Sequence, residues 1–517
     1  MSNERQTDRC AEHESTPLQN TSGHDSESKH EDEDGESTTS SIHGPPFLVE
    51  LRSNRSTQCQ VVLSTCVAFA FGVLGWSKGQ IGPAFLDIMT ISGADLETGS
   101  AFITAYFVGR VVGSLLCGVL YSKVNTYMLL GIAMTGNSAM FAVIPWCTAY
   151  ELMIVVHFLH GLAGGLLAVA LISIAVSIWG VTARGRAYLN IFYAAFAVSG
   201  LFSPIVTSPF LLPAQSYSNI NATSWNVSIH TMHSIDVSTT SSINVSNTMT
   251  VLQTNVTNFL NPKSNLYKAY SISACVAFLA GIPFIVLFFR PTTSNTNSSK
   301  GAEFRFLGSL PVVVKVLQLI NVGIFAAVFN AIDFTFSGFL TVFCVQYLQW
   351  TKTTGSMLTS VVFGATLTGR ILGIFLVHHF NSLTILMFST IVCSIGFLGL
   401  SLSALAYVDA GIWISVCILG IPLGIGWPSI LSWSNEHFVP ACGKMTAFFM
   451  VTAFTGALLS PLLFGYIMEE ISPIWFCYLG LGKTLINIVN VVLILIYSRF
   501  SRAASLILTT KQSARVT

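Results

Sequence analysis

The chain has 517 residues, of which 52% are hydrophobic and only 9% are charged, and its formal net charge is +1. Ordinary soluble domains carry roughly 25% charged residues, so this composition cannot cover the surface of a soluble protein of this length. It excludes a soluble enzyme, a nucleic-acid binder and a wholly disordered chain. It predicts an all-α polytopic membrane protein.

The acidic residues are concentrated at the start of the chain. Residues 1–50 hold 12 of the 23 acidic residues and 3 of the 24 basic residues. A segment with so much net charge and so few apolar residues cannot bury enough surface to fold. Residues 1–58 are therefore predicted to be a disordered acidic tail without a cleavable signal peptide. The tail is either a solvated tether or a phosphorylation or sorting segment, and its partners are unknown.

Twelve apolar runs follow the tail, and each is long enough to cross a bilayer core about 30 Å thick as a helix. In the first half of the chain they cover residues 60–89, 101–121, 127–147, 152–179, 187–212 and 269–289. In the second half they cover residues 312–347, 356–378, 383–406, 411–433, 445–467 and 473–497. Gly72, Gly75, Gly79, Gly82 and Pro83 fall within the first run and are expected to interrupt its helix.

Short motifs recur between the two halves of the chain at nearly one spacing. They are GRVVG at 109–113 with GRILG at 369–373, Gly161 and Gly165 with Gly420 and Gly424, and Ser-Pro at 203–204 with Ser-Pro at 460–461. Such self-similarity predicts two pseudo-symmetric six-helix halves. The predicted domains are a first half at 59–289, a cytoplasmic linker at 290–311, a second half at 312–498 and a cytoplasmic tail at 499–517. Two such halves with a binding site between them are typical of major facilitator transporters.

The basic residues predict which side of the membrane each loop faces. With a cytoplasmic N-terminus, the outer loops hold only Lys263, Lys268 and Lys352. The inner segments then hold twelve basic residues, as the positive-inside rule requires. They are Arg52, Arg55, Lys123, Arg184, Arg186, Arg290, Lys300, Arg305, Lys315, Lys444, Arg499 and Arg502.

The loop at 213–268 tests the same orientation. It carries four N-x-S/T acceptors, at Asn221, Asn226, Asn244 and Asn255. Glycosylation occurs on the outer side of the membrane, where this loop lies in the predicted topology. We therefore expect an extracellular, glycosylated loop, cytoplasmic termini, and the plasma membrane as the location of the protein.

Charged residues inside the spans are candidate functional or structural sites, because a charge at the bilayer centre costs at least a few kcal/mol. Arg110 and Arg370 follow the repeat, and we interpret them as structural charges at the interface of the halves, with substrate anchoring as the alternative. Asp87 and Asp333 lie in the first and seventh spans, which line the cavity in this architecture. Both are candidate cation-coupling residues, although Asp87 could instead reach outer water.

Four side chains are candidate substrate ligands: Gln80, Asn330, Trp427 and Trp433. Aromatic rings pack against the C–H faces of sugars and amides bind their hydroxyls, so this set favours a neutral polyol. Tryptophan is also the usual anchor at a membrane interface, which is the alternative for Trp427 and Trp433. His157 and His160 share one face of the fourth span, but no third ligand appears at helical spacing, so we expect packing rather than a metal site.

Several motifs in order resemble one transporter family. The run from Phe107 to Gly113, continued by Gly118 and by LLGI at 129–132, is similar to the second and third helices of the sodium-dependent glucose transporters. That branch of the major facilitator superfamily also includes major facilitator superfamily domain-containing protein 4. Further matches are GP at 82–83 with Asp87, VIPWC at 143–147, IWG at 178–180, WPS at 427–429 with SW at 432–433, and GK at 443–444 with AFF at 447–449. The resemblance covers residues 60–500 and implies sodium-linked glucose uptake.

The chain departs from that family at positions that bear on the site. The resemblance implies an acid and an amide four residues apart in the fourth span, where this chain has Ala168 and Ile172. A second family acid, in the eleventh span, corresponds to Ala457. Asp87 matches the acid of the first span, and Asp333 lies within one residue of an acid of the seventh. The expected cavity is therefore less polar than that of the family.

We predict a secondary transporter that moves a hexose or a similar neutral solute by alternating access, with sodium as the candidate coupling ion and no other cofactor. One alternative is a transporter of the same fold for a less polar or anionic metabolite. Another is a non-transporting solute sensor. No phosphate-binding loop or nucleophile–base pair is apparent, so the chain is not expected to be an enzyme. Its expected partners are the solute and the lipid bilayer, and no nucleic acid.

Overall fold

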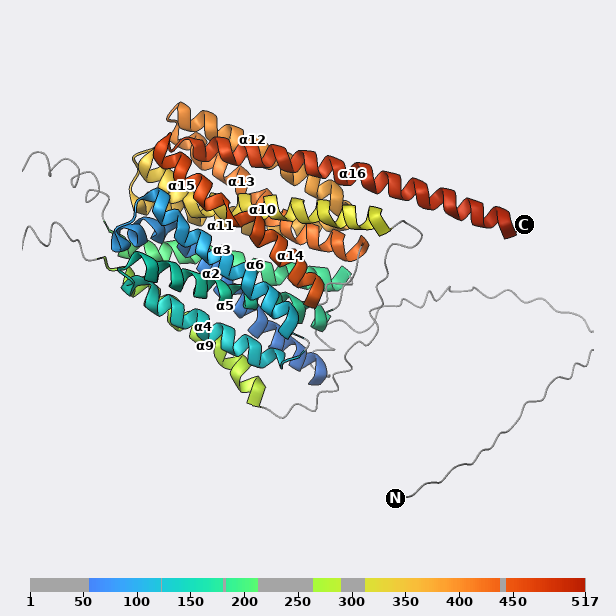
Figure 1. The fold of residues 1–517 in the computed structure, drawn as a ribbon, viewed down its shortest axis with the longest axis horizontal. Helices are drawn as coiled ribbons and strands as arrows, with labels where there is room; N and C mark the ends of the chain where they lie inside the picture. The colour runs from blue at the N-terminus through green and yellow to red at the C-terminus, as the bar shows by residue number, and fades with distance from the viewer. Residues whose placement is uncertain are drawn as a thin grey trace, which may run out of the picture. The chain divides into compact units, whose positions relative to one another are not determined.

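The computed structural model of the chain is a bundle of long helices (Figure 1). The structure describes residues 55–121, 123–179, 183–212, 264–289, 312–437 and 443–516. The predicted acidic tail up to residue 54, the glycosylation acceptors Asn221, Asn226, Asn244 and Asn255, and the linker at 290–311 lie outside the described residues.

The first half of the bundle is built from six long helices and two short 3₁₀ turns. The long helices are α2 (Arg55–Ser92), α3 (Leu96–Leu120), α4 (Thr126–Val143), α5 (Tyr150–Trp179), α6 (Ala183–Thr207) and α9 (Leu266–Phe289). The turns η1 (Ile144–Trp146) and η2 (Ser208–Phe210) extend α4 and α6, and each contains a proline near its start, where a missing N–H costs nothing.

The second half contains six spans, one of which is divided into two helices. Its helices are α10 (Val312–Gln346), α11 (Lys352–His379), α12 (Ser382–Leu405), α13 (Asp409–His437), α14 (Gly443–Leu458), α15 (Ser460–Glu470) and α16 (Trp475–Val516). Helix α16 continues beyond its span, so the described backbone of the predicted C-terminal tail is helical. Among the described residues, twelve helical segments are long and apolar enough to cross a membrane, which confirms the predicted fold class.

The first span differs from its prediction. Its five helix-breaking residues do not interrupt it, because α2 is one continuous helix with Pro83 inside. The glycines serve packing instead. A Cβ atom on Gly75 or Gly79 would collide with the backbone of α6, and one on Gly82 would collide with the backbone of α10. Small residues thus let α2 approach a helix of each half.

The repeated motifs of the two halves make the same kind of contact. Gly109 on α3 and Gly161 on α5 leave no room for a Cβ atom against each other's helix. Gly369 on α11 and Gly424 on α13 do the same in the second half. The recurring glycines therefore set the close approach of the second to the fourth helix in each half.

The two halves meet along two equivalent helix pairs. Helix α3 packs against α14, and α6 packs against α11. In Figure 1 the blue and green helices of the first half lie on one side of these contacts, and most of the yellow and red helices of the second half lie on the other. Residues that project from α2, α3, α10 and α11 toward the facing half can therefore form one interior site.

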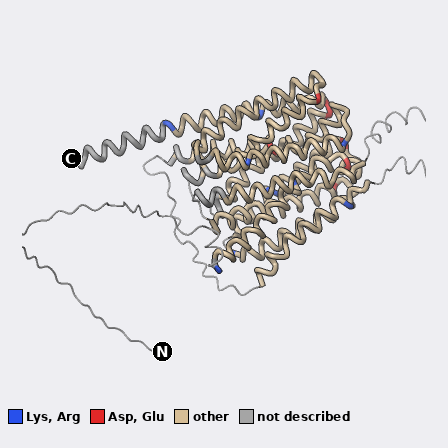
Figure 2. Tube along the Cα trace, turned by 180° about the vertical axis from the view of Figure 1, so that it is seen from behind, with Lys and Arg blue, Asp and Glu red and all other residues tan. Residues whose placement is uncertain are grey.

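Most acidic residues of the described part of the chain lie at one end of the bundle, where α2 connects to α3 and α15 to α16 (Figure 2). They include Asp95, Glu97, Glu469 and Glu470. After the predicted orientation, we name this end the outer end and the opposite one the inner end.

Candidate functional site

A buried ion pair joins the two halves near the outer end. Lys352 Nζ, at the start of α11, lies 2.7 Å from Asp87 Oδ1 on α2. The two side chains are 3% and 0% exposed, respectively. The other carboxylate oxygen, Oδ2, accepts hydrogen bonds from the Leu212 N–H at 2.9 Å and from the Ser264 hydroxyl at 3.1 Å. Asp87 is therefore fully paired in this state.

The position of Lys352 corrects the sequence analysis, which placed it in an outer loop. It begins a helix and is buried instead. A cation is disfavoured at a helix N-terminus by the helix dipole, and the sequence gives no sign of a compensating partner. The carboxylate of Asp87, on a helix of the other half, supplies the opposite charge that makes this position stable.

A second ion pair crosses between the halves deeper in the bundle. Lys78 Nζ on α2 lies 2.6 Å from Asp333 Oδ2 on α10, and the two side chains are 4% and 24% exposed. Lys78 also lies over two rings, 4.5 Å from the centroid of Phe334 and 5.6 Å from that of Phe363. About nine residues, or roughly 13 Å of helix, separate Lys78 from Asp87 along α2. The two pairs are therefore distinct sites on one helix.

Arg110 reaches from the first half into the second. Its Cζ lies 4.3 Å from the ring centroid of Phe454 on α14 and 5.4 Å from that of Phe334 on α10. Its NH1 group donates to the Tyr106 hydroxyl at 3.0 Å. The arginine is buried, and its Nε has no hydrogen-bond partner among the described residues.

Arg370 makes the reciprocal contact from the second half. Its NH1 group donates to the carbonyl oxygen of Tyr193 on α6. The Cζ lies 5.0 Å from the Tyr193 ring centroid and 5.2 Å from that of Phe196. Its Nε is also buried without a partner among the described residues. The two repeat-related arginines thus each cross the interface that the α3–α14 and α6–α11 contacts form.

Four of these groups form a central charge cluster, which we define as Lys78, Arg110, Arg370 and Asp333. Lys78 and Arg110 lie over the same Phe334 ring. Arg370 is within electrostatic range of both Lys78 and Asp333. The cluster holds three cations and one carboxylate, and it lies where the halves face each other.

The predicted substrate ligands do not converge on one point. Gln80 donates to the Thr207 hydroxyl at 3.3 Å and accepts from Ser273 at 2.8 Å, both within the first half. Asn330 donates to the Ala453 carbonyl at 2.9 Å. Trp427 donates to the hydroxyl of Tyr193, the residue of the first half that Arg370 also contacts, at 2.8 Å. Trp433 is buried.

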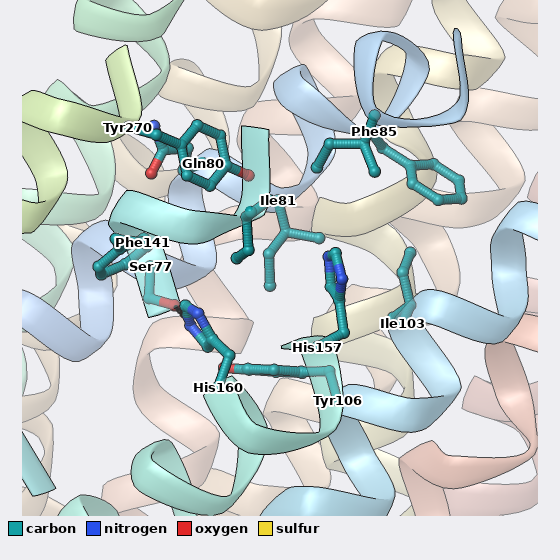
Figure 3. A pocket seen from close by; sticks show the side chains of 12 residues that line it. Ser77, Gln80, Ile81, Phe85, Ile103, Tyr106, Phe141, His157, His160 and Tyr270 are labelled. Atoms are coloured by element: carbon teal, nitrogen blue, oxygen red, sulfur yellow. Dashed lines mark hydrogen bonds between the residues drawn. The ribbon is translucent and has the colours of Figure 1, made fainter. Parts of the chain in front are cut away.

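The two histidines line a small pocket inside the first half (Figure 3). His160 lies 2.9 Å from the Ser77 hydroxyl, and His157 Nδ1 lies 2.8 Å from the Met153 carbonyl oxygen. The rest of its wall comes from the Gln80 amide, the rings of Tyr106 and Tyr270, and apolar side chains of α2, α3, α4 and η1. Among the described residues, no three His, Cys, Asp or Glu side chains are placed to hold a metal ion.

Sequence reasoning missed two lysines, Lys78 and Lys483. Both interrupt apolar spans, and that interruption was the signal that could have found them. Lys483 on α16 donates to the hydroxyls of Thr335 at 3.2 Å and Ser460 at 3.0 Å, and it lies over the Phe464 ring. Ala168 and Ala457, at positions where the family resemblance implies acids, are packed in the core.

The comparisons with known proteins agree with this architecture. The chain is 23% identical over 400 residues to sodium-dependent glucose transporter 1 of Homo sapiens. The aligned region covers 77% of this chain and 72% of the relative. It is 22% identical over 404 residues to sodium-dependent glucose transporter 1A of Mus musculus, covering 77% of this chain and 87% of the relative. No family model matches the chain.

Among solved structures, the fold is similar to that of the fucose:proton symporter FucP of E. coli, with a TM-score of 0.54 and 15% identity. The match covers 86% of this chain and 99% of that chain. These findings confirm the major facilitator fold and the resemblance to the sodium-dependent glucose transporters, and they agree with the twelve membrane-spanning helices of the described residues.

Proposed function

We propose that this chain is a secondary transporter that moves a hydroxyl-rich, sugar-like solute between its two halves by alternating access. The observation that carries the proposal is the central charge cluster, in which helices of both halves place buried charges at one interior position. Such charges are costly in a bilayer and mark solute or ion pathways. The sugar class is taken from the similar proteins, a sodium-dependent glucose transporter and a fucose:proton symporter.

In this proposal the outer ion pair is a gate. Asp87 and Lys352 belong to different halves, so the outer end cannot open while Nζ and Oδ1 remain 2.7 Å apart. Opening admits water to both groups, and hydration replaces their mutual attraction. The pair therefore favours the outward-closed state without making it permanent.

Coupling to a cation is proposed to run through Asp333, with Asp87 assisting. A sodium ion or a proton that binds the Asp333 carboxylate competes with Lys78, which occupies it at 2.6 Å. Moving one charge down a membrane potential of 100 mV yields about 2.3 kcal/mol, enough for more than tenfold accumulation. Sodium is the candidate ion because the relatives are named sodium-dependent.

Uptake by reconstituted protein tests this function. The purified chain in liposomes should take up radiolabelled D-glucose, L-fucose or a related sugar faster than empty liposomes. An inward sodium gradient should raise the accumulation of that solute above the external concentration. Fluxes equal to those of empty liposomes across a panel of neutral and charged sugars would reject a transporter. Equal fluxes with and without any cation gradient would mark a uniporter.

The orientation is proposed from the sequence, with cytoplasmic termini and loop 213–268 outside the cell at the plasma membrane. Glycosidase should increase the electrophoretic mobility of the wild type and leave that of the fourfold Asn→Gln variant at 221, 226, 244 and 255 unchanged. An epitope in this loop that antibodies reach only in permeabilised cells would reverse the orientation.

A further inference from the structure

The central charge cluster carries more positive than negative charge. Three cations, Lys78, Arg110 and Arg370, face the single carboxylate of Asp333. The nearest other buried acid on α2, Asp87, is engaged by Lys352 and two further donors. Among the described residues the cluster therefore keeps two positive charges that no carboxylate balances.

The two arginines hold their guanidinium groups in the same way. In each, NH1 is bound to an oxygen of a tyrosine, the hydroxyl of Tyr106 or the carbonyl of Tyr193. The Nε–H of each is buried and makes no hydrogen bond with a described residue. Each guanidinium thus has one edge fixed by the protein and retains an unpaired donor at Nε. A buried unpaired donor is costly, and an oxyanion is the acceptor that suits a guanidinium best.

We propose that the solute of this transporter is an oxyanion, a sugar acid or a similar hydroxyl-rich carboxylate, phosphate or sulfate, which the excess cations of the central charge cluster attract. The proposal rests on the transport function proposed above and specifies its substrate class. A neutral hydroxyl can accept a bond from an arginine, but it leaves the excess charge of the cluster unchanged. A carboxylate lowers that charge as well, and charge interactions are strong where water is scarce.

An anionic solute also explains how solute and cation could be coupled. A carboxylate that binds Lys78 competes with Asp333 for the same ammonium group. Once Lys78 is drawn to the solute, the Asp333 carboxylate is released to bind a cation. Solute and cation then favour each other's binding, and such coupling is reciprocal by thermodynamic necessity.

Exchange in liposomes tests the proposal with matched pairs of solutes. D-Glucose and D-glucuronate differ in the carboxylate at one carbon, as do D-galactose and D-galacturonate, and D-glucose 6-phosphate adds a phosphate. Liposomes preloaded with unlabelled solute report exchange in either direction without an ion gradient. We expect the acid of at least one pair to exchange at least tenfold faster than its neutral partner, which corresponds to about 1.4 kcal/mol. Faster exchange of the phosphate than of the glucuronate would assign the oxyanion as a phosphate.

Neutral sugars that exchange as fast as their acids, or faster, would overturn the oxyanion proposal and leave the transport function standing. No exchange of any solute of this panel, or of the sugars tested above, would reject both. The two failures are therefore distinguishable in wild-type protein, without relying on a variant that folds.

Variants then test whether the preference for the acid over the neutral sugar depends on the central charge cluster. Arg370→Gln and Lys78→Gln each remove one positive charge from the cluster, and we expect the acid-to-neutral exchange ratio to fall at least tenfold. Arg370→Lys keeps the charge and should retain most of the ratio. Lys483→Gln is the matched control, because it removes a cation that lies outside the cluster. A ratio is independent of how much protein folds, so an unchanged ratio in both cluster variants would contradict the assignment.

Discussion

The two ion pairs that join the halves are chemically alike and differ in their surroundings. Asp87 is 0% exposed and accepts from a lysine, a backbone N–H and a hydroxyl. Asp333 is 24% exposed, accepts from Lys78, and shares its neighbourhood with two arginines. The outer pair is neutral and complete, whereas the central pair sits in a field of excess positive charge.

This difference teaches how one kind of contact can serve two roles. A complete, dehydrated pair favours one arrangement of the two halves, and breaking it by mutation leaves a buried charge behind. A pair with excess charge around it can exchange partners with a solute or an ion. We therefore assign the outer pair to closure and the central pair to binding, and each experiment below breaks or sharpens that distinction.

The largest effect is expected from Lys352→Ala. It leaves Asp87 ionised and buried without its cation, and such a change costs about 3–5 kcal/mol. Thermal unfolding in detergent should show the loss. Ser264→Ala is the control, because it removes one hydrogen bond from the same carboxylate and one from the Leu266 N–H but leaves the ion pair in place, and it should cost less, about 1–2 kcal/mol. The double variant Asp87→Asn with Lys352→Gln should recover much of the stability. Equal stability of Lys352→Ala and wild type would mean that the pair does not hold the outer end closed.

Asp333→Asn is expected to affect transport more than folding. It removes the proposed cation site, so concentration against a gradient should be lost while exchange remains measurable. One charge that moves down a potential of 100 mV supplies about 2.3 kcal/mol. Losing that energy should lower the accumulation of the solute more than tenfold. Uptake measured with and without a cation gradient reports the loss of coupling, and exchange at equilibrium reports whether the solute site is intact. Full concentrative uptake by this variant would remove Asp333 from the coupling mechanism.

Arg110→Ala and Arg370→Ala compare the arginines of the two halves. Each substitution leaves buried oxygens or rings without a partner, which costs about 1–3 kcal/mol. We expect a lower yield of monodisperse protein from both. Arg370→Ala should lower the yield more. Arg370 donates to a fixed backbone carbonyl, whereas Arg110 donates to the Tyr106 hydroxyl, which can rotate. Normal yield of Arg110→Ala with loss of solute affinity alone would contradict its structural role.

The smallest effect concerns acid stability away from both pairs. Asp95 caps α3 by accepting from the Thr98 N–H at 2.8 Å and from its hydroxyl at 2.6 Å, and these hydrogen bonds lower the pKa of Asp95. A lowered pKa in the folded state stabilises the protein above the unfolded pKa of about 4, and this contribution is lost as the pH falls through the folded pKa. Asp95→Ala should cost about 1 kcal/mol at neutral pH.

Asp95→Asn is the control for that titration, since asparagine caps a helix without ionising. The stability difference between wild type and Asp95→Asn should be constant near neutral pH and should shift against the wild type below about pH 4, where the wild type loses the contribution of its ionised carboxylate. The corresponding helix of the second half, α11, is capped by the uncharged Thr351. A pH-independent difference between the two proteins would show that the carboxylate charge contributes nothing to the cap.

Much of the fold could be predicted from the sequence, because hydrophobic length is a local property. The runs at 383–406 and 269–289 correspond closely to α12 (Ser382–Leu405) and α9 (Leu266–Phe289). The first span was predicted less well, since Gly75 and Gly79 break helices in water but are needed where two helices touch. The site was predicted only in part. Asp87, Asp333, Arg110 and Arg370 were named as candidates from the sequence, and the groups that they contact were not.

The sequence by itself determined the number of spans and the presence of acids and arginines inside the bilayer, because each of these depends on neighbours within about 20 residues. It also determined the two-half repeat, because recurring motifs can be compared along the chain without knowing how it folds. The tertiary structure decided which charges meet. Asp87 and Lys352 are 265 residues apart in the chain, and Arg370 and Tyr193 are 177 apart. A charge inside a membrane is stabilised only by a partner within a few ångströms, and only the docking of one half on the other brings such partners together.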